Sequence, residues 1–254
     1  MSLIVRKNCG KSFKGNYCPD CGQPATVHRI NAVYFLHDIP HSIFHVDKGL
    51  PYTFVQLIKR PGLTLKEFLE GKRINHYRPF AYVIILSAIS SLLVHWSGLF
   101  LQYLREKETG TSIPLNENFF VKYQSIFIFL MIPIVSICTW LIFRKNKFNF
   151  WEHVLVNTYL SAQLNVIVLL IQLLVLVKYF ITGSTDYPYK IFMLGFMTAF
   201  MTYYAIAFSS LMRGYQGSWK LGLKLALMCF ILATVYATGM AVTGINAPLN
   251  NLTN

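Results

Sequence analysis

Five long apolar segments dominate the sequence after residue 78. They run from about Pro79 to Leu99, Ser125 to Phe143, Val154 to Val177, Ile191 to Met212 and Leu221 to Thr243. Each is close to the ~20 residues that a helix needs to cross the hydrocarbon core of a bilayer. A buried helix of a water-soluble protein is rarely so long and so apolar. The pattern therefore predicts an all-α membrane protein with about five transmembrane helices, and the low share of charged residues, 13%, agrees with lipid-facing surfaces.

The distribution of Lys and Arg predicts how these helices are oriented. Twelve of the 23 basic residues precede residue 79, and compact basic clusters lie in the loops that follow the second and fourth segments. Because cytoplasmic loops carry an excess of Lys and Arg, we expect a cytoplasmic N-terminus and a C-terminus outside. The apolar run after Met1 covers only residues 3–5, too short for a secretory leader. We therefore expect a multi-pass protein of the inner (cytoplasmic) membrane.

The chain divides into four predicted parts. Residues 1–28 form a small zinc-ribbon-like cytosolic segment, residues 29–78 amphipathic interfacial helices, residues 79–243 a five-helix transmembrane bundle, and residues 244–254 a short extracytoplasmic tail. Within the second part, the stretches starting at Thr53 and Thr64 each show capping-box spacing, and Gly71 stands where a helix ends in a left-handed residue. Both stretches are too short to span a bilayer and match helices that lie at its surface.

Basic residues follow the second of these helices. We expect Lys72, Arg73 and Arg78 to contact anionic lipid headgroups. The alternative is general anchoring by positive charge, with no preference for a particular lipid.

Three cysteines lie close together in "NCGKSFKGNYCPDCGQ", residues 8 to 23. Cys18 and Cys21 form a C-x-x-C knuckle, in which two thiolates reach one metal ion. Cys9 resembles the second half of an earlier knuckle, whose first position is occupied by Arg6. In a reducing compartment such a cluster favours metal, and specifically zinc, over disulfides. His28 is the nearest candidate for a fourth ligand; a degenerate ribbon without metal and a redox C-x-x-C are the alternatives.

The cysteine stretch, together with "DKGLPYTFVQLIKRPG" and "LEGKRINHYRPFAYV", resembles a bacterial family known only as a domain of unknown function. The resemblance covers most of residues 8–85 by motif and the rest by hydropathy. It implies a cytoplasmic zinc ribbon of four cysteines joined to a polytopic membrane region. Cys9, Cys18 and Cys21 match that pattern, whereas Arg6 departs from it. The resemblance implies no activity.

Three histidines, His37, His41 and His45, recur at four-residue spacing, which places them near one helical face. A metal or pH-sensing site is one interpretation. Pro40 interrupts the helix that they would share. Interfacial histidines on an amphipathic helix are therefore the favoured interpretation.

The interiors of the apolar segments hold polar but uncharged side chains. Transporters that couple to ions usually place charged residues at mid-membrane, and these segments have none near their centres. We expect their amides to join helices to one another. The pair Glu152 and His153 has too few polar neighbours in the sequence for acid–base chemistry. The polar residues within the segments are His95, Asn157, Gln163, Asn165 and Gln172.

Taken with the absence of nucleotide and nucleic-acid motifs, these features predict a protein that is not an enzyme and does not bind nucleic acid. The leading hypothesis is a membrane adaptor, or an accessory subunit of a larger membrane complex, that contacts anionic lipids and a protein partner. The alternative is a small oligomeric transporter, channel or lipid-handling protein. The oligomeric state stays open.

Overall fold

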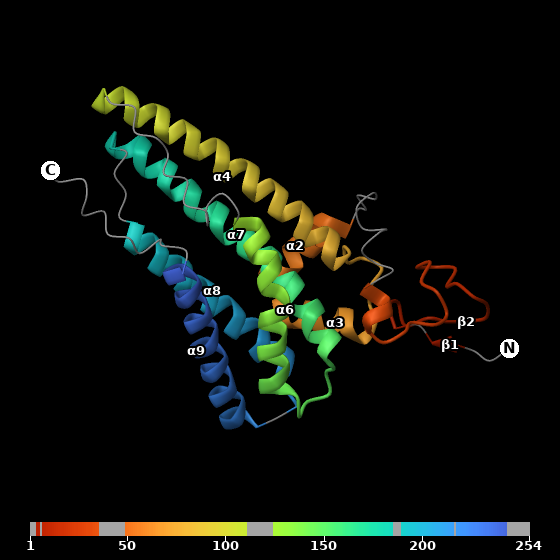
Figure 1. The fold of residues 1–254 in the computed structure, drawn as a ribbon. Helices are drawn as coiled ribbons and strands as arrows, with labels where there is room; N and C mark the ends of the chain where they lie inside the picture. Colours follow the sequence, from red (N-terminus) through yellow and green to blue (C-terminus); the bar gives the residue numbers. More distant parts are fainter. Residues whose placement is uncertain are drawn as a thin grey trace.

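The computed structural model describes residues 4–5, 7–35, 49–110, 124–184, 189–215 and 217–242. Each of the five apolar segments lies in a helix: α4 (Pro79–Thr109), α6 (Gln124–Phe143), α7 (Phe150–Thr182), α8 (Tyr189–Met212) and α9 (Ser218–Val242) (Figure 1). Among the described residues, three helical stretches are long and apolar enough to cross a membrane: α4, α7 and the Leu194–Met212 part of α8. A shorter apolar stretch lies in α6, from Ile128 to Phe143. Crossing by α6 and α9 stays a prediction.

Helices α4 and α7 lie side by side and run in the same direction (Figure 1). Polar contacts between them advance together along both helices, which is the pattern of a parallel pair. These hydrogen bonds are Gln163 Nε2 to Tyr82 Oη at 2.6 Å, Asn165 Nδ2 to Ser87 Oγ at 3.1 Å and Gln172 Nε2 to Ser97 Oγ at 2.7 Å. Since a polar group in lipid must be satisfied within the protein, these contacts confirm the expectation that the amides join helices.

The first half of α7 is the centre of the molecule. Residues 152–165 are buried on every side of the helix. On the α6 side, Asn157 Nδ2 donates to Thr139 Oγ1 at 2.9 Å and to Ser136 Oγ at 3.2 Å. On the α8 side, the rings of His153 and Phe208 stack with their centroids 6.2 Å apart. A helix surrounded in this way fixes the positions of its neighbours.

Two short helices, α2 (Gly49–Lys59) and α3 (Pro61–Glu70), precede the bundle. Both threonine caps expected from the sequence are wrong. Helix α2 already begins at Gly49, so Thr53 lies inside it and accepts a hydrogen bond from the N–H of Tyr77 at 2.7 Å. Helix α3 begins at Pro61, whose fixed φ suits the first helical position, so Thr64 also lies within a helix. Gly71 ends α3 at φ 108°, as expected.

Helices α2 and α3 pack among the long helices. Gly62 in α3 touches α8 so closely that an added Cβ would lie 2.4 Å from the carbonyl oxygen of Ala207. The ring of Phe68 meets that of Tyr159 in α7 edge to face, with centroids 5.5 Å apart. These contacts attach the α2–α3 pair firmly to α7 and α8.

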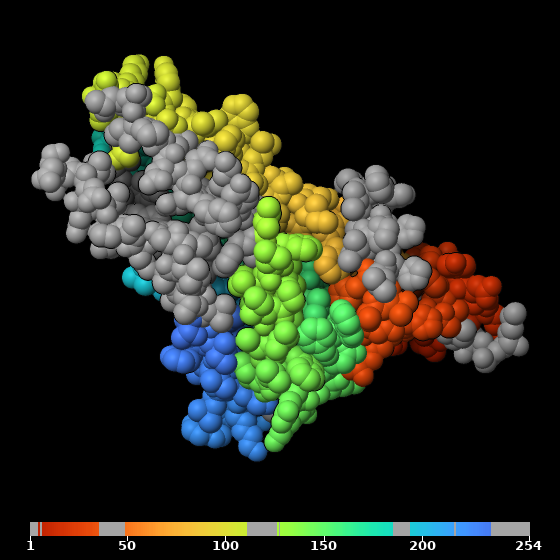
Figure 2. All heavy atoms as spheres, viewed as in Figure 1, coloured from red at the N-terminus to blue at the C-terminus, as the bar shows by residue number. Residues whose placement is uncertain are grey.

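The N-terminal segment, which consists of the described residues between 4 and 35, projects from one end of the molecule, next to the start of α7 (Figure 2). Its strands β1 (Ile4–Val5) and β2 (Ser12–Phe13) form an antiparallel pair. A single bridge between Tyr17 and Pro24 closes a second turn. Arg6, the three histidines His37, His41 and His45, and the tail at 244–254 lie outside the described residues.

Candidate functional site

The structure brings the three N-terminal cysteines together. The sulfur atoms of Cys9, Cys18 and Cys21 all lie within 4.8 Å of one another, and those of Cys9 and Cys18 are 3.7 Å apart. Two sulfurs on one tetrahedral zinc ion are about 3.8 Å apart, given Zn–S bonds of about 2.3 Å. Gly10 and Gly22, which follow the two knuckles, both have positive φ, 75° and 69°, which lets the chain turn tightly. The group can bind a metal ion.

The surroundings of Cys18 favour its metal-binding form. Hydrogen bonds from the backbone N–H groups of Cys21 and Asp20 lower the pKa of its thiol. The thiolate is the form that ligates metals. Among the described residues the group consists of three cysteines, and His28 lies outside it, in the wall of the cavity described below. The donor set therefore fits zinc through three sulfurs.

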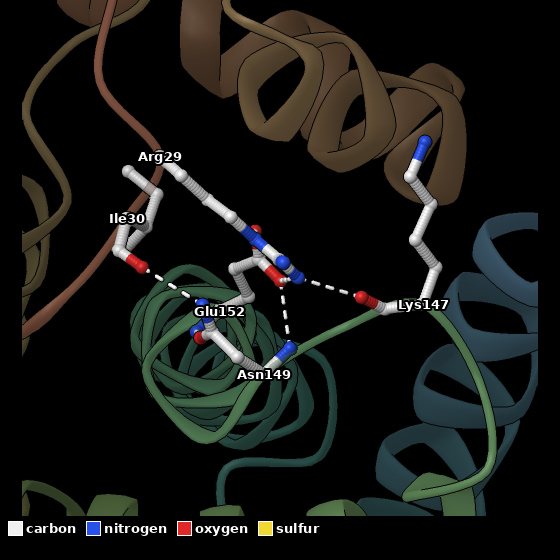
Figure 3. A network of polar contacts seen from close by, with 5 residues as sticks. All are labelled: Arg29, Ile30, Lys147, Asn149 and Glu152. Atoms are coloured by element: carbon white, nitrogen blue, oxygen red, sulfur yellow. Dashed lines mark hydrogen bonds and ion pairs between the residues drawn. The ribbon is translucent and has the colours of Figure 1, made fainter.

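An ion pair attaches the N-terminal segment to the start of α7 (Figure 3). The guanidinium of Arg29 donates to both carboxylate oxygens of Glu152, each at 2.8 Å, and to the carbonyl of Lys147 at 2.6 Å. Glu152 also accepts from the backbone N–H of Asn149, and the Asn149 side chain donates to the carbonyl of Ile30 at 3.0 Å. Asn149 and Glu152 form the capping box that starts α7, so the same residues begin the helix and hold the segment.

A second set of contacts attaches the segment to the end of α3. Gln23 Nε2 donates to the carbonyl of Gly71 at 2.6 Å. Arg73 donates to the carbonyls of His28 at 3.1 Å and Phe68 at 3.2 Å, and its guanidinium lies 5.3 Å from the ring centroid of Tyr34. The segment is thus held at two places on the helical part of the chain.

A cavity of about 570 Å³ lies between these two attachments. Five separate stretches of the chain contribute to its walls. Its charged lining residues are Lys7, Arg29, Lys72, Arg73 and Lys147 with Glu70 and Glu152. Two of the three residues expected to contact headgroups, Lys72 and Arg73, therefore lie in one cavity, whereas Arg78 lies outside its lining, at the start of α4. The formal charge of the lining is +3 with His28 neutral.

Glu152 and His153 have separate environments. The Glu152 carboxylate is occupied by Arg29 and the capping box. The ring nitrogens of His153 have no hydrogen-bond partner among the described residues, and its ring stacks on Phe208. The two neighbours in sequence therefore do not act as an acid–base pair in this arrangement.

The sequence did not identify Lys7, Arg29 and Lys147 as residues that line the cavity. The N-x-x-E spacing of Asn149 and Glu152 is a recognisable capping box and predicts the start of α7. The sequence around Glu152 does not identify its partner, because Arg29 lies 123 residues away.

The model of a protein family described as "Protein of unknown function (DUF3667)" matches residues 47–91. This range holds α2, α3 and the first part of α4. No curated protein and no solved structure matches the chain.

Proposed function

We propose that the chain is a non-enzymatic membrane adaptor, or an accessory subunit of a larger complex, in the bacterial inner membrane, with a cytoplasmic N-terminus and a C-terminus outside. The observation that carries the proposal is the double attachment of the N-terminal segment, to α7 through Arg29 and Glu152 and to α3 through Gln23 and Gly71. A small segment held at two points on a bundle presents a surface of fixed orientation, which reduces the entropy lost when a partner binds.

Zinc is the metal that we propose for the three cysteines. A segment of this size buries little apolar surface, so a metal ion would supply much of its folding free energy. His28 is the fourth ligand that the sequence offers, and a side chain of the partner is the alternative. A ligand supplied by a partner would link metal binding to assembly.

The surface of the N-terminal segment suits a protein partner. Tyr17 is 67% exposed and Val5 is 66% exposed. Tyrosine is enriched among the residues that dominate binding energy at protein interfaces. We propose that the partner docks on the segment through exposed side chains such as these.

Crosslinking from inside native membranes tests the adaptor role. A photoreactive residue at Tyr17 should capture one stoichiometric partner, and capture should fall sharply when the Arg29→Ala change loosens the segment. The same label at Phe230, which is 67% exposed on α9, is the matched control and should capture no such partner. If the Tyr17 label captures only other copies of the chain, and the purified oligomer passes ions or solute into liposomes, the adaptor role is wrong and the transporter or channel alternative takes its place.

A further inference from the structure

The cavity between the N-terminal segment and the helices has the features of an anion site. Its volume of about 570 Å³ falls within the ~300–1,000 Å³ typical of small-ligand pockets. Glu152 is already paired with Arg29, which leaves Glu70 as the remaining carboxylate of the lining. Lys72 Nζ also lies 3.5 Å from Glu67 Oε1, a carboxylate outside the lining. With Glu67 counted, the five cations of the lining still exceed the nearby carboxylates by two.

Two of its cationic groups are held in fixed positions. Arg29 is held by both oxygens of Glu152, and Arg73 is held by two backbone carbonyls and by the rings of Tyr34 and Phe68. A guanidinium that needs no reordering loses less entropy on binding a ligand. The contacts of Arg29 with described residues use Nε and Nη2, so its Nη1 group is the one that can donate to a phosphate oxygen.

Two further cations are available to a ligand. Among the described residues, Lys7 and Lys147 form no ion pair. In Figure 3 the ammonium group of Lys147 points away from the Arg29–Glu152 pair. General positive-inside anchoring needs basic residues only somewhere on the cytoplasmic side. It does not account for the place of the basic residues 7, 29, 72, 73 and 147 in the lining of one cavity.

We propose that this cavity binds a phosphate group, and that its carrier is an anionic phospholipid. The cavity is lined by the end of α3, the loop before α7 and Tyr215 in the loop after α8, so it lies where the helices end. In the proposed orientation this is the cytoplasmic headgroup level, where basic pockets between helices bind acidic headgroups. The proposal rests on that orientation and is independent of the adaptor role.

The test compares two pairs of charge-removing changes in the full chain. Lys72→Gln with Lys147→Gln removes two cations from the cavity. Lys145→Gln with Lys220→Gln removes two cations outside its lining, one in the loop after α6 and one in the first turn of α9. Each protein is reconstituted into nanodiscs with phosphatidylglycerol at increasing fractions in phosphatidylcholine, and bound lipid is measured by native mass spectrometry after release. We expect the cavity pair to lose about tenfold or more in apparent affinity, and the control pair less than about threefold.

An equal loss of apparent affinity in both double variants overturns the cavity as the binding site and leaves only general attraction to the anionic membrane surface. Inorganic phosphate, added to protein in neutral lipid, identifies the carrier. If millimolar phosphate alone protects the cavity residues from hydrogen exchange, and the Lys72→Gln, Lys147→Gln variant loses this protection, the phosphate site is supported and the lipid is overturned as its carrier. No protection by phosphate, with phosphatidylglycerol binding lost in the cavity pair, supports the lipid. Partner capture from Tyr17 is unaffected by either result, so the two proposals fail separately.

Discussion

The Arg29→Ala change is the sharpest test of how the N-terminal segment is held. The change removes two hydrogen bonds to Glu152 and one to the Lys147 carbonyl. The Glu152 side chain is only 5% exposed, and loss of one member of a buried pair costs roughly 3–5 kcal/mol. Arg29 itself is 57% exposed and Glu152 keeps its contact with Asn149, so the expected cost is lower, about 2 kcal/mol.

This loss should appear locally, as easier opening of the segment from the bundle. A free energy of about 2 kcal/mol corresponds to an increase of about 30-fold in the equilibrium constant for opening. Hydrogen exchange of the protein in nanodiscs, followed by peptide mass spectrometry, measures that opening for residues 7–30. Exchange along α4 and the second half of α7 should stay unchanged.

A surface ion pair within the same segment supplies the control. Lys11 Nζ lies 2.7 Å from Asp20 Oδ1, and both side chains are exposed. Lys11→Ala should therefore cost less than about 1 kcal/mol and accelerate exchange by only a few fold. If Arg29→Ala accelerates exchange no more than Lys11→Ala does, the ion pair does not hold the segment and the reasoning is refuted. Arg29→Lys, which cannot bind both oxygens in the same geometry, should lie between them.

Three further predictions follow from single residues. The purified protein should hold about one zinc ion per chain by elemental analysis, and Cys18→Ser should remove it; undiminished zinc in the variant would rule out the cysteine site. Gly62→Ala places a Cβ 2.4 Å from the Ala207 carbonyl and should cost about 1–3 kcal/mol, seen as a lower Tm, whereas Gly98→Ala, which meets nothing within 4 Å, should not lower it. Burial lowers the pKa of His76 from 6.5 to about 4, so between these pH values the unfolded chain binds more protons than the folded chain. The free energy of unfolding should therefore decline as the pH falls from 6.5 toward 4. In thermal unfolding, His76→Phe should weaken this decline, and an unchanged pH dependence would exclude His76 as its source.

The helices were predictable because apolar runs of this length have few other stable forms, but their ends were less so. The first apolar run stops at Leu99, whereas α4 continues to Thr109 because polar residues such as Gln102 and Glu106 pair along the helix, 3.0 Å apart, until Gly110 ends it. Helix α7 starts at Phe150, ahead of its apolar run, because of the capping box before it. Hydropathy responds to side-chain polarity and cannot register these local hydrogen bonds.

The candidate site was predictable only in its local parts. The knuckle spacing predicts that Cys18 and Cys21 approach each other, and the paired glycines extend this to Cys9. The cavity depends on contacts between distant stretches, such as Arg29 with Glu152, which carry no signal in a single sequence. The capping-box spacing at Thr53 also predicted the wrong start for α2. The Thr53 hydroxyl instead accepts a hydrogen bond from the N–H of Tyr77, 24 residues away.

The parallel pairing of α4 and α7 has a consequence for biogenesis. The partners Gln172 and Ser97 are separated by 75 residues, which a ribosome takes roughly 4–15 s to add at ~5–20 residues per second. Throughout that interval α4 has left the ribosome with its polar side chains still lacking their α7 partners. The helix at the centre of the molecule is the third of the long helices to be synthesised. We therefore expect nascent α4 to stay beside the insertion machinery until α7 is synthesised, for a time that the rate of translation sets.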